Sequence, residues 1–249
     1  MKRILGILAV VALVAMTVQA VEVKSENVAG VYTKTLPSNG GLLLVAVQVD
    51  PFDSADANLA GVLGTDQLRG FISKVQSPDK VYVWNGTGYD IYWLEGGEWV
   101  DESGPTNPPI ETGDAFWIRS AQNEDDPLDL TITGQAVEST DITTPISAGL
   151  NLAGYPFSSK IAVNDTDFIN DGASQFESKK TSSDKIYLWD NVNGGYTILI
   201  SNLGNDYWHL EGSDGSTPAT EEITLGDAFW YKAEGGYSWD ETNKYLNNL

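Results

Sequence analysis

The sequence predicts a mainly β protein made of two tandem, duplicated antiparallel modules, sandwich-like or barrel-like, each with at most one short helix. The first observation is a repeat: DKVYVW at residues 79–84 returns as DKIYLW at 184–189, and GDAFWI at 113–118 returns as GDAFWY at 226–231. The second is that these runs are short, rich in β-branched and aromatic residues, and bounded by Gly and Asn turns, which is typical of strands. A module copied in tandem is more typical of a scaffold or binding unit than of a catalytic site.

The spacing of the two copies predicts the domain limits. The pairs Pro51 and Pro156, Asp79 and Asp184, and Trp84 and Trp189 all lie 105 residues apart, and the spacing grows to 113 at the GDAFW segments. Surface loops that take insertions produce this drift. We expect the first module, with an N-terminal entry strand, over residues 21–137 and the second over 138–249.

Strand and turn signals recur in the same order in both copies. Each Asp-Lys run leads through a Gly/Asn turn into a second run at Tyr89 or Tyr196, which is a hairpin signature. The DAFW segments are expected to be strands, and further strands are expected at residues 41–49, 128–134, 149–157 and 237–246. One short helix is expected near residues 57–63, capped by Ser54 or Asp56. The other is expected around residues 168–169, with Asn164 or Asp165 as the preceding cap.

The N-terminus predicts export. Lys2 and Arg3 precede an apolar run over residues 4–18, and Val18-Gln19-Ala20 completes the pattern of a secretory signal peptide over residues 1–20. The run is shorter than the roughly 20 residues that a membrane-spanning helix needs. We therefore expect a mature chain without a membrane span, located in the periplasm, outside the cell or on the cell surface.

Composition excludes several classes of function. The formal charge of −21 becomes −23 when Lys2 and Arg3 leave with the signal peptide, and a surface this acidic disfavours nucleic acid and anionic lipid as partners. The chain has no cysteine and one histidine, His209. Disulfides, thiolate zinc sites, cysteine catalysis and a lipoprotein anchor are thereby excluded.

Aromatic residues supply the first candidate site. Trp84, Trp117, Trp189 and Trp230 lie in apolar strands at matched places and are predicted to pack in the core. Other aromatic residues lie in polar, Gly-rich surroundings and could form an exposed, sugar-stacking patch. These candidate ligand-binding residues are Trp93, Trp99, Trp208, Tyr89, Tyr92, Tyr196 and Tyr207.

Carboxylates supply the second candidate site. Asp50, Asp53 and Asp56 are a candidate calcium site, and calcium is the one cofactor that the sequence suggests, although the spacing lacks the glycine and terminal glutamate of an EF-hand loop. The alternative is a solvated acidic loop. Asp114 and Asp227, each after a turn glycine, are predicted to accept backbone N–H bonds within their turns.

A resemblance follows from these motifs. SENVAGV at residues 25–31, followed by Pro-Phe, DKVYVW and a closing GDAFW strand, resembles a loosely defined family of exported bacterial β-module proteins without an assigned activity. The resemblance covers nearly all of the mature chain, although the second copy lacks the S-x-N-V-x-G entry. It implies a secreted or surface-associated β protein and carries over no catalytic residue.

Three hypotheses for function follow. The leading one is an exported, non-enzymatic protein that acts as a structural, surface-associated or adhesive component, with other copies of itself or surface components as partners. Its alternative is a secreted carbohydrate-binding protein that uses exposed Trp and Tyr rings. The third is a glycan-cleaving enzyme, which would need two carboxylates facing each other in an aromatic-lined cleft. Under the leading hypothesis, we expect that the protein is not an enzyme.

Overall fold

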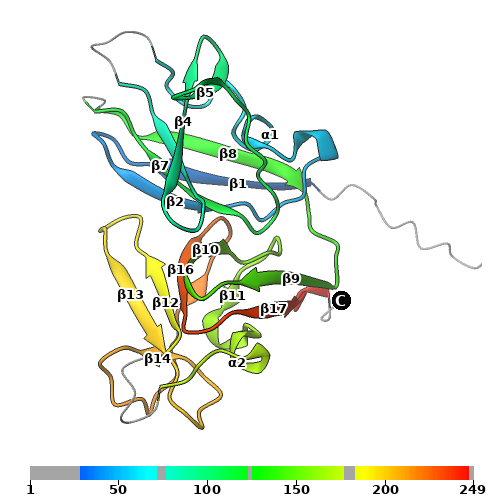
Figure 1. Ribbon diagram of the computed structural model, residues 1–249, viewed down its shortest axis with the longest axis vertical. Coiled ribbons are helices and arrows are strands. Elements are labelled where there is room, and N and C mark those ends of the chain that lie inside the picture. Colours follow the sequence, from blue (N-terminus) through cyan, green and yellow to red (C-terminus); the bar gives the residue numbers. More distant parts are fainter. Residues whose placement is uncertain (1–28, 72–76, 123–124, 177–182, 247–249) are drawn as a thin grey trace, which may run out of the picture.

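The fold is mainly β, as the sequence predicts. In the computed structural model, which describes residues 29–71, 77–122, 125–176 and 183–246, antiparallel ladders build two β modules that lie one above the other (Figure 1). Within these residues, strands β1 to β8 pair among themselves and strands β9 to β17 pair among themselves. The predicted signal peptide lies outside the described residues.

The first module pairs a six-stranded sheet with a two-stranded ladder. The sheet order is β2 (Leu42–Ala46), β7 (Ala115–Arg119), β3 (Lys80–Trp84), β4 (Tyr89–Glu95), β5 (Glu98–Asp101) and β6 (Gly104–Pro105). The ladder joins β1 (Ala29–Leu36) to β8 (Leu128–Gln135). A 3-10 turn (Ser54–Asp56) and the short helix α1 (Leu59–Leu63) complete the module.

The second module repeats this plan. Its main sheet runs β10 (Gly149–Gly154), β16 (Ala228–Ala233), β12 (Lys185–Trp189), β13 (Tyr196–Ile200) and β14 (His209–Leu210). Two ladders join β9 (Asp141–Ile146) to β17 (Tyr237–Thr242) and β11 (Ile161–Ala162) to β15 (Glu222–Ile223). A 3-10 turn (Val163–Asp165) precedes the helix α2 (Phe168–Asp171). The order β10-β16-β12-β13 matches β2-β7-β3-β4.

Each main sheet has two buried faces. In the first module, one face packs on the β1–β8 ladder and on α1, with Phe116, Ile118 and Val81 fully buried. In the second module, Phe229 and Tyr231 occupy the corresponding face and pack on Phe168 and Trp239. Because side chains alternate along a strand, the neighbouring residues of these strands point to the opposite face, toward the other module.

We call the contact between these opposite faces the seam. Trp84 of β3 packs edge-on against Trp230 of β16 at 5.1 Å between ring centroids, and Trp117 of β7 packs against Trp189 of β12 at 5.1 Å. The prediction that these four tryptophans pack inside the module cores is therefore wrong about their location. Trp117 and Trp230 are buried and Trp84 and Trp189 half-buried, but between the modules rather than inside them.

Two of the hydrogen bonds across the seam form a reciprocal pair. Ala46 N donates to Gly226 O at 3.0 Å, and Gly154 N, at the equivalent place, donates to Gly113 O at 2.9 Å. Leu44 N donates to Asn191 Oδ1 at 3.0 Å, so the second module covers the outer edge of β2. The edge near residues 41–49, whose exposure would have favoured head-to-tail strand pairing between chains, is therefore occupied at Leu44 and Ala46.

The turns and helix caps follow local rules. Asp114 Oδ2 accepts from Glu111 N at 2.8 Å and Asp227 Oδ2 accepts from Thr224 N at 3.1 Å, which confirms their predicted role in turns. The preceding glycines, Gly113 and Gly226, have positive φ angles of 89° and 79°. The predicted caps were wrong by a few residues: Asn58 caps α1, and no side chain caps α2.

Candidate functional site

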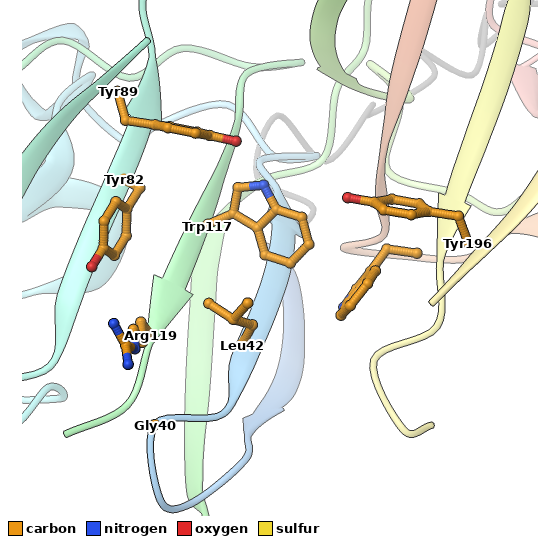
Figure 2. Close-up of a pocket in the computed structure, with 8 residues that line it drawn as sticks. Gly40, Leu42, Tyr82, Tyr89, Trp117, Arg119 and Tyr196 are labelled. Atoms are coloured by element: carbon orange, nitrogen blue, oxygen red, sulfur yellow. The ribbon is translucent and has the colours of Figure 1, made fainter. Parts of the chain in front are cut away.

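A groove opens along the seam on the side of β2. It has a volume of about 480 Å³ and receives side chains from both modules (Figure 2). The lining, which we call the seam groove, consists of Gly40, Leu42, Tyr82, Tyr89, Trp117, Arg119, Trp189 and Tyr196. Five of these eight residues are aromatic. A second hollow of about 650 Å³ lies beyond Trp189, but Trp189 is the one aromatic ring that lines it.

Strand register places the first module's share of the groove. Leu42 of β2 lies opposite Arg119 of β7, and Trp117 of β7 lies opposite Tyr82 of β3. All four occupy alternate positions on the face that points away from the module core. Tyr89 begins β4 next to Trp84, its ring 6.0 Å from that of Tyr82 in an edge-on contact.

The second module supplies the opposite wall. The ring of Trp189 lies 5.1 Å from that of Trp117 and 5.0 Å from that of Tyr196. In Figure 2 the rings of Tyr89 and Tyr196 extend toward each other from the two modules, with Trp117 between them. The walls are thus fixed by edge-on aromatic contacts that hold each ring in a defined orientation.

The two tyrosines at the groove mouth are exposed and uncharged. Tyr89 is 39 % and Tyr196 is 44 % exposed. Partial burial raises the pKa of Tyr89, and the electrostatic interaction with the nearby Tyr196 phenol adds to the rise, while a hydrogen bond from Trp117 offsets part of it. Partial burial likewise raises the pKa of Tyr196 against a hydrogen bond from Trp230. Both phenols therefore stay protonated near neutral pH and can donate as well as accept hydrogen bonds.

The remaining wall carries a positive charge. Arg119 is exposed, and a side chain at Gly40 would come within 3.7 Å of its guanidinium, so the glycine leaves that group open. Lys80 lies opposite Arg119 in the register of β3 and β7, and its Nζ lies 5.8 Å from the ring centroid of Trp93.

The structure separates the predicted ligand-binding residues. Tyr89 and Tyr196 line the seam groove, and Trp93 is half-buried on the same sheet face next to Lys80. The expected exposure was wrong for the following three residues, which are at most 8 % exposed: Tyr92, Trp99 and Trp208. Tyr207 is half-buried and donates to Gly215 O at 2.9 Å, away from the groove.

The buried tryptophans serve the module cores. Trp99 Nε1 donates to Gly64 O at 2.9 Å within the first core, and Trp208 packs against Phe168 at 6.4 Å in the second. Polar flanking sequence predicted them to be exposed: Trp99 lies in the short strand β5, and Trp208 directly precedes the short strand β14. Their own side chains point inward all the same.

Sequence reasoning assigned Trp117 and Trp189 to the core and did not identify four further groove residues: Gly40, Leu42, Tyr82 and Arg119. The available signal was the apolar character of both faces in KVYVW and KIYLW. A strand with one solvated face alternates apolar and polar residues, whereas these runs do not, which indicates that both faces are covered.

The proposed calcium ligands are occupied by other partners or lie apart. Asp50 Oδ1 accepts from Thr112 Oγ1 at 2.5 Å, and Asp53 Oδ1 accepts from Ala55 N at 2.9 Å as the cap of the 3-10 turn. Across the residues that the structure describes, no three Asp, Glu or His side chains come close enough to hold a metal ion. The arrangement therefore does not support calcium at Asp50, Asp53 and Asp56.

Neither helix of the described ranges is long and apolar enough to cross a membrane. Comparisons with protein-family models, with curated proteins and with solved structures each returned no match to this chain.

Proposed function

We propose that this is an exported, non-enzymatic carbohydrate-binding protein that holds its ligand in the seam groove. The observation that carries the proposal is the gathering of five aromatic rings from two modules around one open groove of about 480 Å³. Small-molecule sites in proteins have volumes of roughly 300 to 1,000 Å³ and combine apolar walls with a few polar groups.

The chemistry of the lining suits a sugar. A pyranose ring presents a flat C–H face and an edge of hydroxyl groups, so it needs apolar surface and hydrogen-bonding groups side by side. Tyrosine and tryptophan supply both from one side chain. Tyr89 and Tyr196 offer uncharged hydroxyls beside the ring faces, and Trp117 and Trp189 form the apolar floor between them.

The lining favours binding over cleavage. Glycoside hydrolysis uses a pair of carboxylates on either side of the scissile bond. No Asp or Glu is among the described residues that line the seam groove. A ligand there would meet aromatic rings, one guanidinium and an aliphatic side chain.

A structural or adhesive role on the outside of the cell is the second candidate. It is favoured by the seam, which joins the two modules through contacts of β2 and β7 with β10 and β16. Export rests on the signal peptide pattern and on the resemblance to exported β-module proteins. Sugar binding and surface adhesion are compatible, because an adhesin needs a ligand.

The proposal is tested with the mature protein, residues 21–249, titrated with a panel of neutral and acidic oligosaccharides. Tryptophan fluorescence is a suitable signal, since Trp117 and Trp189 lie in the groove. We expect a saturable change for at least one sugar class, weakened about tenfold or more in Tyr196→Ala, because truncation removes a stacking face worth roughly 1–3 kcal/mol.

Tyr245→Ala is the matched control. Tyr245 is 59 % exposed and lies outside the groove lining, so its loss should leave every affinity unchanged. Equal binding by wild type and Tyr196→Ala, or silence across the whole panel, would reject the seam groove as a sugar site.

A further inference from the structure

One end of the seam groove is lined by Arg119, and a second cation, Lys80, lies next to it on the neighbouring strand, outside the lining. Arg119 lies directly opposite Lys80 on one side and Leu42 on the other, in the registers of β7 with β3 and β2. Directly opposite residues on one face of an antiparallel pair have Cβ atoms roughly 5 Å apart, and like charges in that position destabilise the sheet. The pair therefore needs a counter-charge or carries a cost.

The second module shows how this cost is offset. Lys185 and Lys232 are opposite each other in β12 and β16, as Lys80 and Arg119 are in β3 and β7. Lys185 forms an ion pair with Glu211, and Lys232 forms one with Glu234 at 3.1 Å. Each cation of that pair has its own carboxylate.

In the first module, Lys80 and Arg119 differ from this arrangement. In the part of the chain that the structure describes, no carboxylate pairs with Lys80 or Arg119, and the contact of Lys80 is the Trp93 ring. The chain has 35 acidic and 14 basic residues, so counter-charges are abundant elsewhere. Among the described residues, the groove thus presents a guanidinium without a paired carboxylate at the end of an aromatic wall.

We propose that the seam groove selects an acidic sugar, whose carboxylate or sulfate group is held by Arg119 with Lys80 as the second cation. A guanidinium donates two parallel hydrogen bonds to either anion, and such charge-assisted bonds are stronger than neutral ones. The inference rests on the proposed function, because the aromatic walls must first hold the sugar ring. It adds charge as the selecting feature.

The test compares ligands that differ in charge alone. Wild-type protein at about 0.15 M salt, where charges more than about 8 Å away are screened, is titrated with an oligogalacturonate and its methyl ester. A sulfated galactan oligosaccharide and its desulfated parent form the second arm. We expect the anionic member of one pair to bind about tenfold or more tightly than its neutral partner. The arm that shows the preference identifies the anion as carboxylate or sulfate.

Arg119→Gln should remove that preference, so that the anionic and neutral members of the pair bind this variant with equal affinity. Lys232→Gln, at the equivalent place in the second module, should change neither affinity. Equal affinities within both ligand pairs would overturn the selection of acidic sugars, and a preference that persists in Arg119→Gln would overturn the role of Arg119. Either result leaves the groove as a sugar site. Loss of neutral and acidic binding alike in Tyr196→Ala supports the groove itself, so the two proposals fail separately.

Discussion

At the residue scale, Glu241 is a carboxylate shielded from water. It is fully buried, and its Oε2 accepts bonds from Asp167 N and Trp239 Nε1, both at 2.8 Å. Its Oε1 accepts no hydrogen bond from the residues that the structure describes and lies 3.7 Å from Lys244 Nζ. Burial raises the pKa of Glu241 from 4.5 to about 7, against the hydrogen bonds and Lys244, with the charge of Asp167 adding to the rise.

This raised pKa predicts that stability falls as pH rises. Between pH 4.5 and about 7 the folded state keeps the Glu241 proton while the unfolded state has released it, so the folded state binds more protons there. The free energy of unfolding should therefore decrease by roughly 3 kcal/mol across that window from this group alone. Urea unfolding at a series of pH values measures it.

Glu241→Gln isolates this effect from other titrating groups. The variant keeps an oxygen acceptor for Asp167 N and Trp239 Nε1 but cannot ionise, so its stability profile should be flatter between pH 4.5 and 7. Parallel profiles for wild type and Glu241→Gln would show that Glu241 does not titrate in this range.

Residue-level prediction from sequence worked where the determinants are local. Asp114 and Asp227 follow turn glycines, and a short polar side chain there bonds its own turn whatever the rest of the fold does. It failed for Trp99 and Trp208, because burial depends on which distant strand covers a side chain. That information is absent from the flanking residues.

At the element scale, hairpins were the most predictable feature. The strands at Lys80–Trp84 and Lys185–Trp189 each pair with the next strand along the chain. The turn that connects each pair of strands is recognisable in the sequence by its Gly and Asn residues. The ladder of β1 with β8 joins residues about 100 positions apart and could not be derived from local pattern. The groove depends on a still longer relation, the packing of one module on the other.

At Gly154, β10 approaches the first module so closely that there is no room for a side chain. A Cβ at this position would lie 2.3 Å from the Cβ of Ala46 across the seam, so Gly154→Ala should destabilise the protein by roughly 1–3 kcal/mol through overpacking. Gly235→Ala is the control, since nothing lies within 4 Å of that position. Urea unfolding of both variants compares them, and equal stabilities would contradict the close contact.

At the scale of the whole molecule, the seam should make the two modules unfold together. It combines aromatic contacts with hydrogen bonds and with the ion pair of Lys34 and Asp227 at 2.6 Å. We expect one transition, with coincident midpoints by tryptophan fluorescence and far-UV circular dichroism. Two separated transitions in the wild type would show that the modules are energetically independent.

Trp84→Ala should weaken this coupling; Trp84 does not line the groove itself, but its ring contacts that of the lining residue Tyr89 at 5.3 Å. The substitution removes the contact with Trp230 at 5.1 Å and the bond from Trp84 Nε1 to Leu150 O at 3.2 Å. We expect a loss of up to about 3 kcal/mol or a splitting of the single transition. An unchanged midpoint would place the coupling elsewhere in the seam.

The reciprocal bonds of the seam have the form of a twofold contact between identical subunits, in which any side chain placed at one site is placed at both. Here the two halves belong to one polypeptide, so a substitution at Arg119 leaves Lys232 as it was. The two modules therefore meet as the subunits of a homodimer do, but the residues at equivalent positions can differ, as they do in a heterodimer. Lys185 and Lys232 form ion pairs with glutamates, whereas Arg119, in the equivalent pair of the first module, lines the groove.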